Sequence, residues 1–126
     1  MIQINSTSYK SIKRIAVRIP LKMFSRIESN LLQSGYNKKQ RLHWFEDILK
    51  ELFERENYHN LIAEEFIEAG TTKIINLSVT DETFQIIKRT VKEVEEKEKT
   101  TTDRSSIIRT AILQRLLQTS IQEMGE

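Results

Sequence analysis

Residues 13–19 begin with Lys13 and then alternate cationic or small side chains with apolar ones. Such alternation is typical of a β-strand, in which successive side chains point to opposite faces. Arg14 and Arg18 would then share one face, with Ala16 between them. An arginine fork matches the O6 and N7 acceptors of guanine, and an alanine can contact the methyl group of thymine. The spacing therefore indicates a strand face that can read base edges in duplex DNA.

A second segment, residues 73–79, alternates in the same way but with different outward residues. Asn76 suits adenine, Ile74 suits a thymine methyl group, and Ser78 offers a single hydroxyl. We expect the first strand to discriminate more between bases, because it carries two arginine forks. The alternative is that both outward faces are solvated sides of edge strands, where charges discourage aggregation.

Further cations and hydroxyls occur at the strand starts and at the expected starts of two helices. A helix N-terminus offers backbone N–H groups and a positive dipole to a phosphate. The predicted phosphate contacts are Lys13, Lys38, Lys39, Arg41, Lys73, Arg104, Ser105 and Ser106. The alternative is that these are ordinary residues of helix starts and strand ends.

Both strands belong to an internal repeat, which predicts the elements that position these residues. Six apolar positions return with identical spacing 60 residues later: Ile15, Val17, Ile19, Phe24, Ile27 and Leu31 become Ile75, Leu77, Val79, Phe84, Ile87 and Val91. A second block that starts at Arg41 returns 63 residues later at Arg104. Within each copy the apolar period changes from two to about 3.6, which predicts a strand followed by two helices.

Individual residues predict where these helices begin and end. Pro20 stops the first strand, and Gly35 is expected to end the helix that follows. The expected starts of later helices are Asn37 or Gln40 in the first copy, and Thr80 and Asp103 in the second. The expected core of the first copy's second helix consists of Trp44, Phe45, Ile48, Leu49, Leu52 and Phe53.

The segments KRIAVRIP (residues 13–20) and TDRSSIIRTAI (residues 102–112) resemble the ribbon-helix-helix proteins of the Arc and methionine-repressor type. The resemblance covers residues 13–58 and 73–121. It implies a mainly α-helical fold with short β-strands, in which two β-α-α modules pair their strands into an antiparallel ribbon. In that family the ribbon enters the major groove and the second helices hold flanking phosphates. The layout is similar to plasmid-transfer regulators of the TraY type.

This chain departs from the family pattern at two places. The first module has no Ser or Thr where its second helix opens, and the outward residues of the second strand include no Arg. The second module's share of base reading is therefore in question.

The repeat also predicts the domain organisation. We expect a flexible arm at residues 1–12, modules at 13–58 and 73–121, a linker at 59–72 that can be helical, and a short tail at 122–126. Residues 57–72 could span roughly 50 Å at about 3.3 Å per residue, enough to return the second strand beside the first. We therefore predict that the strands pair within one chain. Pairing of like strands between two chains is the alternative.

The net charge of +2 hides an uneven distribution. Residues 1–45 contain nine Lys or Arg and one acid, whereas residues 46–70 contain eight acids and two cations. A basic end can attract a polyanion while an acidic body stays solvated. Ordinary solvated helix faces would give a similar composition. The acidic segment 60–69 is either a linker helix or a contact for another protein.

Other classes of function find little support in the sequence. The chain has no cysteine, and His43 and His59 lack the spacing of metal ligands, so we expect no metal, no cofactor and no enzyme activity. No apolar run reaches the roughly 20 residues of a membrane span, and we expect a cytoplasmic protein with no membrane partner.

The expected function is sequence-specific regulation of transcription, in a plasmid or another mobile element. The alternatives are a conjugation accessory protein that binds a transfer origin and an antitoxin-like protein-interaction module. The expected partners are double-stranded DNA, a second copy in a homodimer or higher oligomer, and transcription or transfer proteins.

Overall fold

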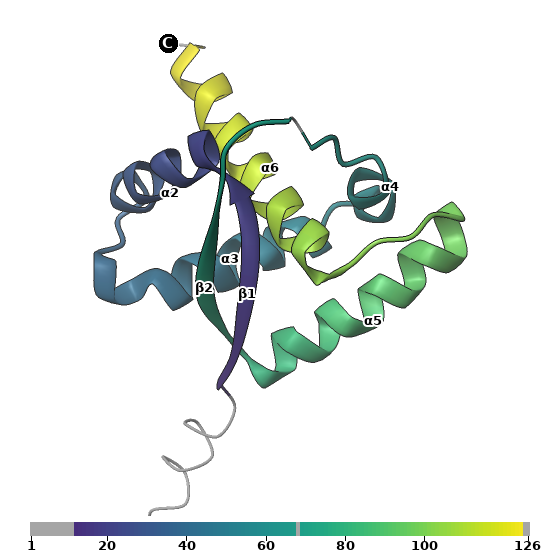
Figure 1. The fold of residues 1–126 in the computed structure, drawn as a ribbon. Coiled ribbons are helices and arrows are strands. Elements are labelled where there is room, and N and C mark those ends of the chain that lie inside the picture. Colours follow the sequence, from purple (N-terminus) through teal and green to yellow (C-terminus); the bar gives the residue numbers. More distant parts are fainter. Residues whose placement is uncertain (1–11, 68, 125–126) are drawn as a thin grey trace, which may run out of the picture.

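Each copy of the repeat folds as a strand followed by two helices in the computed structural model, which describes residues 12–67 and 69–124 (Figure 1). The first copy comprises β1 (Ile12–Pro20), α2 (Leu21–Gln33), a 3₁₀ turn η1 (Lys38–Gln40) and α3 (Arg41–Phe53). The second comprises β2 (Thr72–Thr80), α5 (Asp81–Glu98) and α6 (Arg104–Met124). A short helix, α4 (Tyr58–Ala63), lies between the copies. The predicted fold, mainly helical with two β-α-α units, is confirmed.

The two strands pair antiparallel within the one chain, as predicted. The register runs from Ile12 opposite Thr80 to Pro20 opposite Thr72. Each strand is therefore one residue longer at both ends than the alternating segments 13–19 and 73–79. The strands extend beyond the alternating segments because each one supplies backbone hydrogen-bond partners to the other.

The inward face of the ribbon forms one side of the core. Its six apolar residues are at most 5% exposed: Ile15, Val17, Ile19, Ile75, Leu77 and Val79. Figure 1 shows α3 and α6 crossing behind the ribbon, with α2 and α5 on opposite sides. Large apolar side chains of α3 and α6 fill the space beneath the strands, and burial of each contributes about 1.5–3 kcal/mol.

The predicted core of α3 is confirmed except at its last residue. Trp44 and Phe45 are 0% and 1% exposed, with ring centroids 5.0 Å apart in an edge-to-face arrangement. Phe53 is only half-buried, and its ring packs edge-on against Tyr58 of α4 at 5.7 Å. It thus packs against the core and also against the linker helix.

The first module turns sharply between α2 and α3. Gly35 has a φ of +91°, a left-handed conformation that glycine adopts without steric cost. Here the N–H of Tyr36 donates to the Leu31 carbonyl at 3.0 Å, which satisfies the end of α2. Both expected starts of the next helix are used, because Asn37 caps η1 and Gln40 precedes the first residue of α3.

Candidate nucleic-acid interface

The six predicted base-reading residues lie together on the outward face of the ribbon. The register places three pairs directly opposite each other: Arg14 with Ser78, Ala16 with Asn76, and Arg18 with Ile74. Ser78 is half-buried and the other five are exposed. Residues about 60 positions apart in the chain thus form one continuous surface, opposite the buried face of the same strands.

Thr72 also belongs to this surface, although sequence reasoning did not single it out. Its Oγ1 accepts a hydrogen bond from Nη1 of Arg18 at 2.9 Å. Thr72 lies two residues before Ile74, so it has the same strand parity. Continuing the alternation by one step would have found it. The hydroxyl holds the Arg18 fork while leaving its other N–H groups for a ligand.

The start of α3 lies beside the outward face of β2. A hollow of about 240 Å³ lies between them, lined by Ile12, Arg41, Leu42, Phe45, Asn76, Leu77 and Ser78. Arg41 is half-buried, and its Cζ lies 5.9 Å from the centroid of the Phe45 ring. A predicted phosphate contact and two predicted base-reading residues therefore line the same hollow.

The turn before α3 presents the other predicted cations of the first module. Lys39 is exposed, and its backbone N–H donates to Oδ1 of Asn37 at 2.9 Å. That bond fixes the turn from which the lysine side chain projects. The side chain of Lys38 lies outside what the structure describes.

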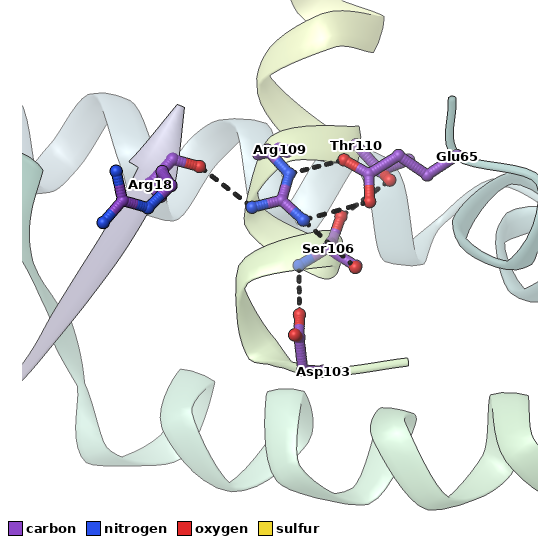
Figure 2. Close-up of polar contacts among 6 residues, drawn as sticks. All are labelled: Arg18, Glu65, Asp103, Ser106, Arg109 and Thr110. Atoms are coloured by element: carbon purple, nitrogen blue, oxygen red, sulfur yellow. Dashed lines mark hydrogen bonds and ion pairs between the residues drawn. The ribbon is translucent and has the colours of Figure 1, made fainter. Parts of the chain in front are cut away.

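The start of α6 differs from that of α3 because an acid caps it. Oδ1 of Asp103 accepts the N–H of Ser106 at 2.8 Å, which confirms the expected cap (Figure 2). Oγ of Ser106 accepts from Nη2 of Arg109 at 3.3 Å. The N–H and the hydroxyl oxygen of Ser106 thus have partners within the protein, and the Asp103 carboxylate lowers the positive potential for a phosphate.

The two remaining residues of the predicted α6 cluster differ in exposure. Arg104 is exposed, and its Cζ lies 5.4 Å from the centroid of the Phe84 ring. Ser105 is half-buried. Because Asp103 caps α6 while the first turn of α3 contains no acid, the start of α3 is the more favourable of the two to an anion.

Lys13 and Lys73 occupy equivalent positions at the starts of the two strands, and both are exposed. Nζ of Lys13 lies 4.0 Å from an Asp81 oxygen, and Nζ of Lys73 lies 4.2 Å from the centroid of the Phe24 ring. Exposed contacts of these kinds contribute up to about 1 kcal/mol. Either side chain can therefore exchange its present partner for a phosphate.

An ion pair with little exposure to solvent contacts the β1 backbone. Nη1 of Arg109 donates to the backbone carbonyl of Arg18 at 2.9 Å, and Nε donates to Glu65 at 2.6 Å (Figure 2). The Arg109 and Glu65 side chains are each 10% exposed. Sequence reasoning missed both residues, because a charged pair across 44 positions leaves no local pattern.

The start of α5 receives a different contact from the first module. Glu46 of α3 accepts the N–H of Thr80 at 2.7 Å and the hydroxyl of Thr83 at 2.6 Å. Thr80 also caps α5 as expected, since its Oγ1 accepts the N–H of Thr83 at 3.2 Å. The two modules are therefore joined by polar contacts as well as by the core.

The displaced pKa values belong to a cluster between α4 and α5. The hydrogen bond from His59, at 2.9 Å, holds the pKa of the Glu93 carboxyl below its usual range against the opposing effect of burial. Burial raises the pKa of Tyr58, and the neighbouring Glu93 adds to this effect. The cluster ties the linker helix to the second module.

Within residues 12–67 and 69–124, no three His, Asp or Glu side chains gather as metal ligands. In the same part of the chain, no helix combines the length and apolarity needed to cross a bilayer. Comparison of the chain with protein-family models, with curated proteins and with solved structures found no match.

Proposed function

We propose that the chain is a transcriptional regulator that binds double-stranded DNA sequence-specifically, with the β1–β2 ribbon in the major groove. The observation that carries this is the ribbon's division into two faces. Three cross-strand pairs are directed outward and six apolar residues inward. Two strands about 4.8 Å apart are narrow enough for a groove about 12 Å wide.

β1 and β2 present different outward side chains, so the two halves of a binding site would meet different hydrogen-bonding and apolar groups. On β1, Arg14 and Arg18 suit guanines, and Ala16 suits a thymine methyl group. On β2, Asn76 suits adenine and Ile74 suits a thymine methyl group. Because the ribbon comes from one chain, its halves are not identical, and the preferred site of one ribbon should not be a palindrome.

Phosphate contacts would position the ribbon on either side. The start of α3 supplies Lys39 and Arg41, with Arg41 in the hollow beside Asn76. The start of α6 supplies Arg104 and Ser105. Because Asp103 caps α6, the first module should carry the larger share of phosphate binding.

Selection of bound sequences from random duplexes tests this function directly. The expected result is a non-palindromic preferred site, with guanines on the side of β1. Binding to that site should weaken with salt, by about 0.9 in log K per log unit of salt for each phosphate contacted. No measurable duplex binding, or a salt slope near zero, would reject the proposal.

A matched pair of variants separates the ribbon from general positive charge. Arg14→Ala combined with Arg18→Ala should remove the preference for guanines on the side of β1. Lys92→Ala combined with Lys97→Ala removes the same charge from exposed positions of α5 and should leave it unchanged. A reporter gene placed behind the selected site then tests regulation, which requires transcription to change when the chain is expressed.

A further inference from the structure

The backbone beneath Arg18 is held by two residues outside the outward face of the ribbon. Arg109 of α6 donates to the Arg18 carbonyl and is itself held by Glu65 through two hydrogen bonds, at 2.6 and 3.2 Å. Figure 2 shows the Arg18 carbonyl turned toward Arg109 while its guanidinium extends to the other side. One residue thus carries both the proposed base contact and the anchored carbonyl.

The geometry of Arg109 makes this anchor stiff. A guanidinium is planar, and its donors form a rigid fork, so fixing two nitrogens on Glu65 also fixes the direction of the third. Both side chains are only 10% exposed. Separating them would leave each charge uncompensated and largely out of water, which is costly. Glu65 in the linker therefore constrains Arg109, and Arg109 constrains the β1 backbone at Arg18.

The equivalent place in the other module is built differently, which argues for a specific role. The repeat aligns Arg109 with Glu46, and Thr80 with Pro20. Glu46 accepts the N–H of Thr80, whereas Pro20 has no N–H to offer. Where Glu46 of the first module accepts from β2, Arg109 of the second module donates to β1, and the group that it contacts is the carbonyl of Arg18 itself.

We infer that the Glu65–Arg109 pair positions Arg18 for base reading and so determines sequence preference without touching DNA. This role rests on the proposed function. Arg109 fixes the strand backbone and Thr72 fixes the fork, and together they hold the Arg18 guanidinium at one place above the ribbon. A guanidinium that is free to shift by about 1 Å would still be attracted to DNA by its charge. Its N–H groups would no longer match the acceptors of one particular base.

Two mild variants test this role. Glu65→Gln removes the charge that anchors Arg109, and Arg109→Lys keeps the charge but cannot reach Glu65 and the Arg18 carbonyl together. For each folded variant, dissociation constants are measured on the selected site and on a random duplex. We expect the preference for the selected site to fall about tenfold, with affinity for the random duplex nearly unchanged.

Glu51→Gln is the matched control, since Glu51 pairs with Arg115 on the same helix, α6. It should leave the preference unaltered. A second readout needs no DNA: the Ile19 amide nitrogen shares its peptide group with the Arg18 carbonyl. Its chemical shift should move in Glu65→Gln and Arg109→Lys but stay in place in Glu51→Gln.

Three outcomes oppose the inference. An unchanged preference in both folded variants would overturn it, as would an equal loss of affinity on the selected and random duplexes. An unmoved Ile19 shift would show that the anchor does not control the strand. Failure of the unmodified chain to bind any duplex would reject the proposed function itself, and is recognised before any variant is made.

Discussion

Arg18 illustrates which properties of a residue its local sequence predicts. Alternation with Val17 and Ile19 predicts that its side chain faces outward, and the structure places it there, exposed. Its bond to Thr72 depends on the register between strands, and its carbonyl contact depends on how α6 docks. Neither is local. The face of the candidate site was therefore predictable, whereas the groups that hold it in place were not.

Replacing Arg18 by Ala is expected to weaken binding to the selected site by about 1–3 kcal/mol and to relax the preference at one base position. In the proposed complex the lost fork discriminates between bases, and the exposed side chain buries nothing in the core. Fluorescence anisotropy on the selected site and on its single-base variants measures both effects. Circular dichroism should show an intact fold.

Lys39→Ala provides the contrast for that experiment. As a proposed phosphate contact, Lys39 should contribute similarly on every sequence, so its loss should lower the salt slope by roughly one and leave base preference unaltered. If folded Arg18→Ala kept both the affinity and the base preference of the parent chain, the ribbon face would not be the reading surface.

At the scale of elements, the start of α5 combines a predicted contact with an unpredicted one. Thr80 with acids in the next two positions indicates a helix cap, and the structure confirms it. The contribution of Glu46 from α3 was not predictable, because it joins residues 34 positions apart. Its carboxylate satisfies a backbone N–H of the β2–α5 junction and places negative charge at a helix N-terminus, which is favourable.

We expect Thr80→Ala to lower the free energy of unfolding by about 1 kcal/mol, because the Thr83 N–H loses its side-chain acceptor. Urea denaturation measures this. Ser25→Ala is the control, since Ser25 is exposed and bonds within its own helix to the Lys22 carbonyl, and it should have a much smaller effect. Equal stability of the parent and Thr80→Ala would mean that Glu46 alone secures the junction.

The acidic stretch of residues 46–70 shows why charge counts alone are ambiguous. Within the acidic stretch, Glu65 pairs with Arg109, Glu51 with Arg115, and Asp47 accepts from Tyr36. Several of its acids therefore serve internal contacts, in addition to any effect on the surrounding field. Composition located the charges but could not assign their partners, since the partners lie in other elements.

The docking of α4 on α5 should depend on pH through Glu93. Its pKa is lowered in the folded state, mainly by the hydrogen bond from His59, so ionised Glu93 favours folding. This contribution is present above the ordinary carboxyl pKa and is lost as pH falls through the lowered value. Glu93→Gln should therefore be less stable than the parent chain at neutral pH, and the difference should shrink on acidification.

Denaturation of both chains at about pH 7 and about pH 3 compares these regimes. The comparison should be made well below the ordinary glutamate pKa of about 4.3, so that the unfolded carboxyl is protonated. A stability difference that stays constant between the two pH values would show that Glu93 acts through packing rather than through its charge.

At the scale of the whole molecule, the repeat predicted the architecture because its two halves share one core pattern. Neither strand can satisfy its backbone or cover its inward face alone, so they had to pair. The linker was long enough to allow pairing within one chain. The docking of α4 against α5, with Ile62 buried, was not evident, because the segment is short and its apolar spacing is irregular.

Because β1 and β2 of one chain complete the ribbon, folding should not require a second copy. The melting temperature should stay constant over about a hundredfold range of protein concentration, since concentration enters only when unfolding also dissociates subunits. Circular dichroism melts at several dilutions, with sedimentation to report the mass, measure this.

If like strands paired between chains, dilution would lower the melting temperature and separate the folded dimer. A cross-link joining Val17 of two chains would indicate the same exchanged arrangement. Constant melting together with a monomeric mass would show that each chain folds with its own ribbon, so any self-association on DNA would join units already complete.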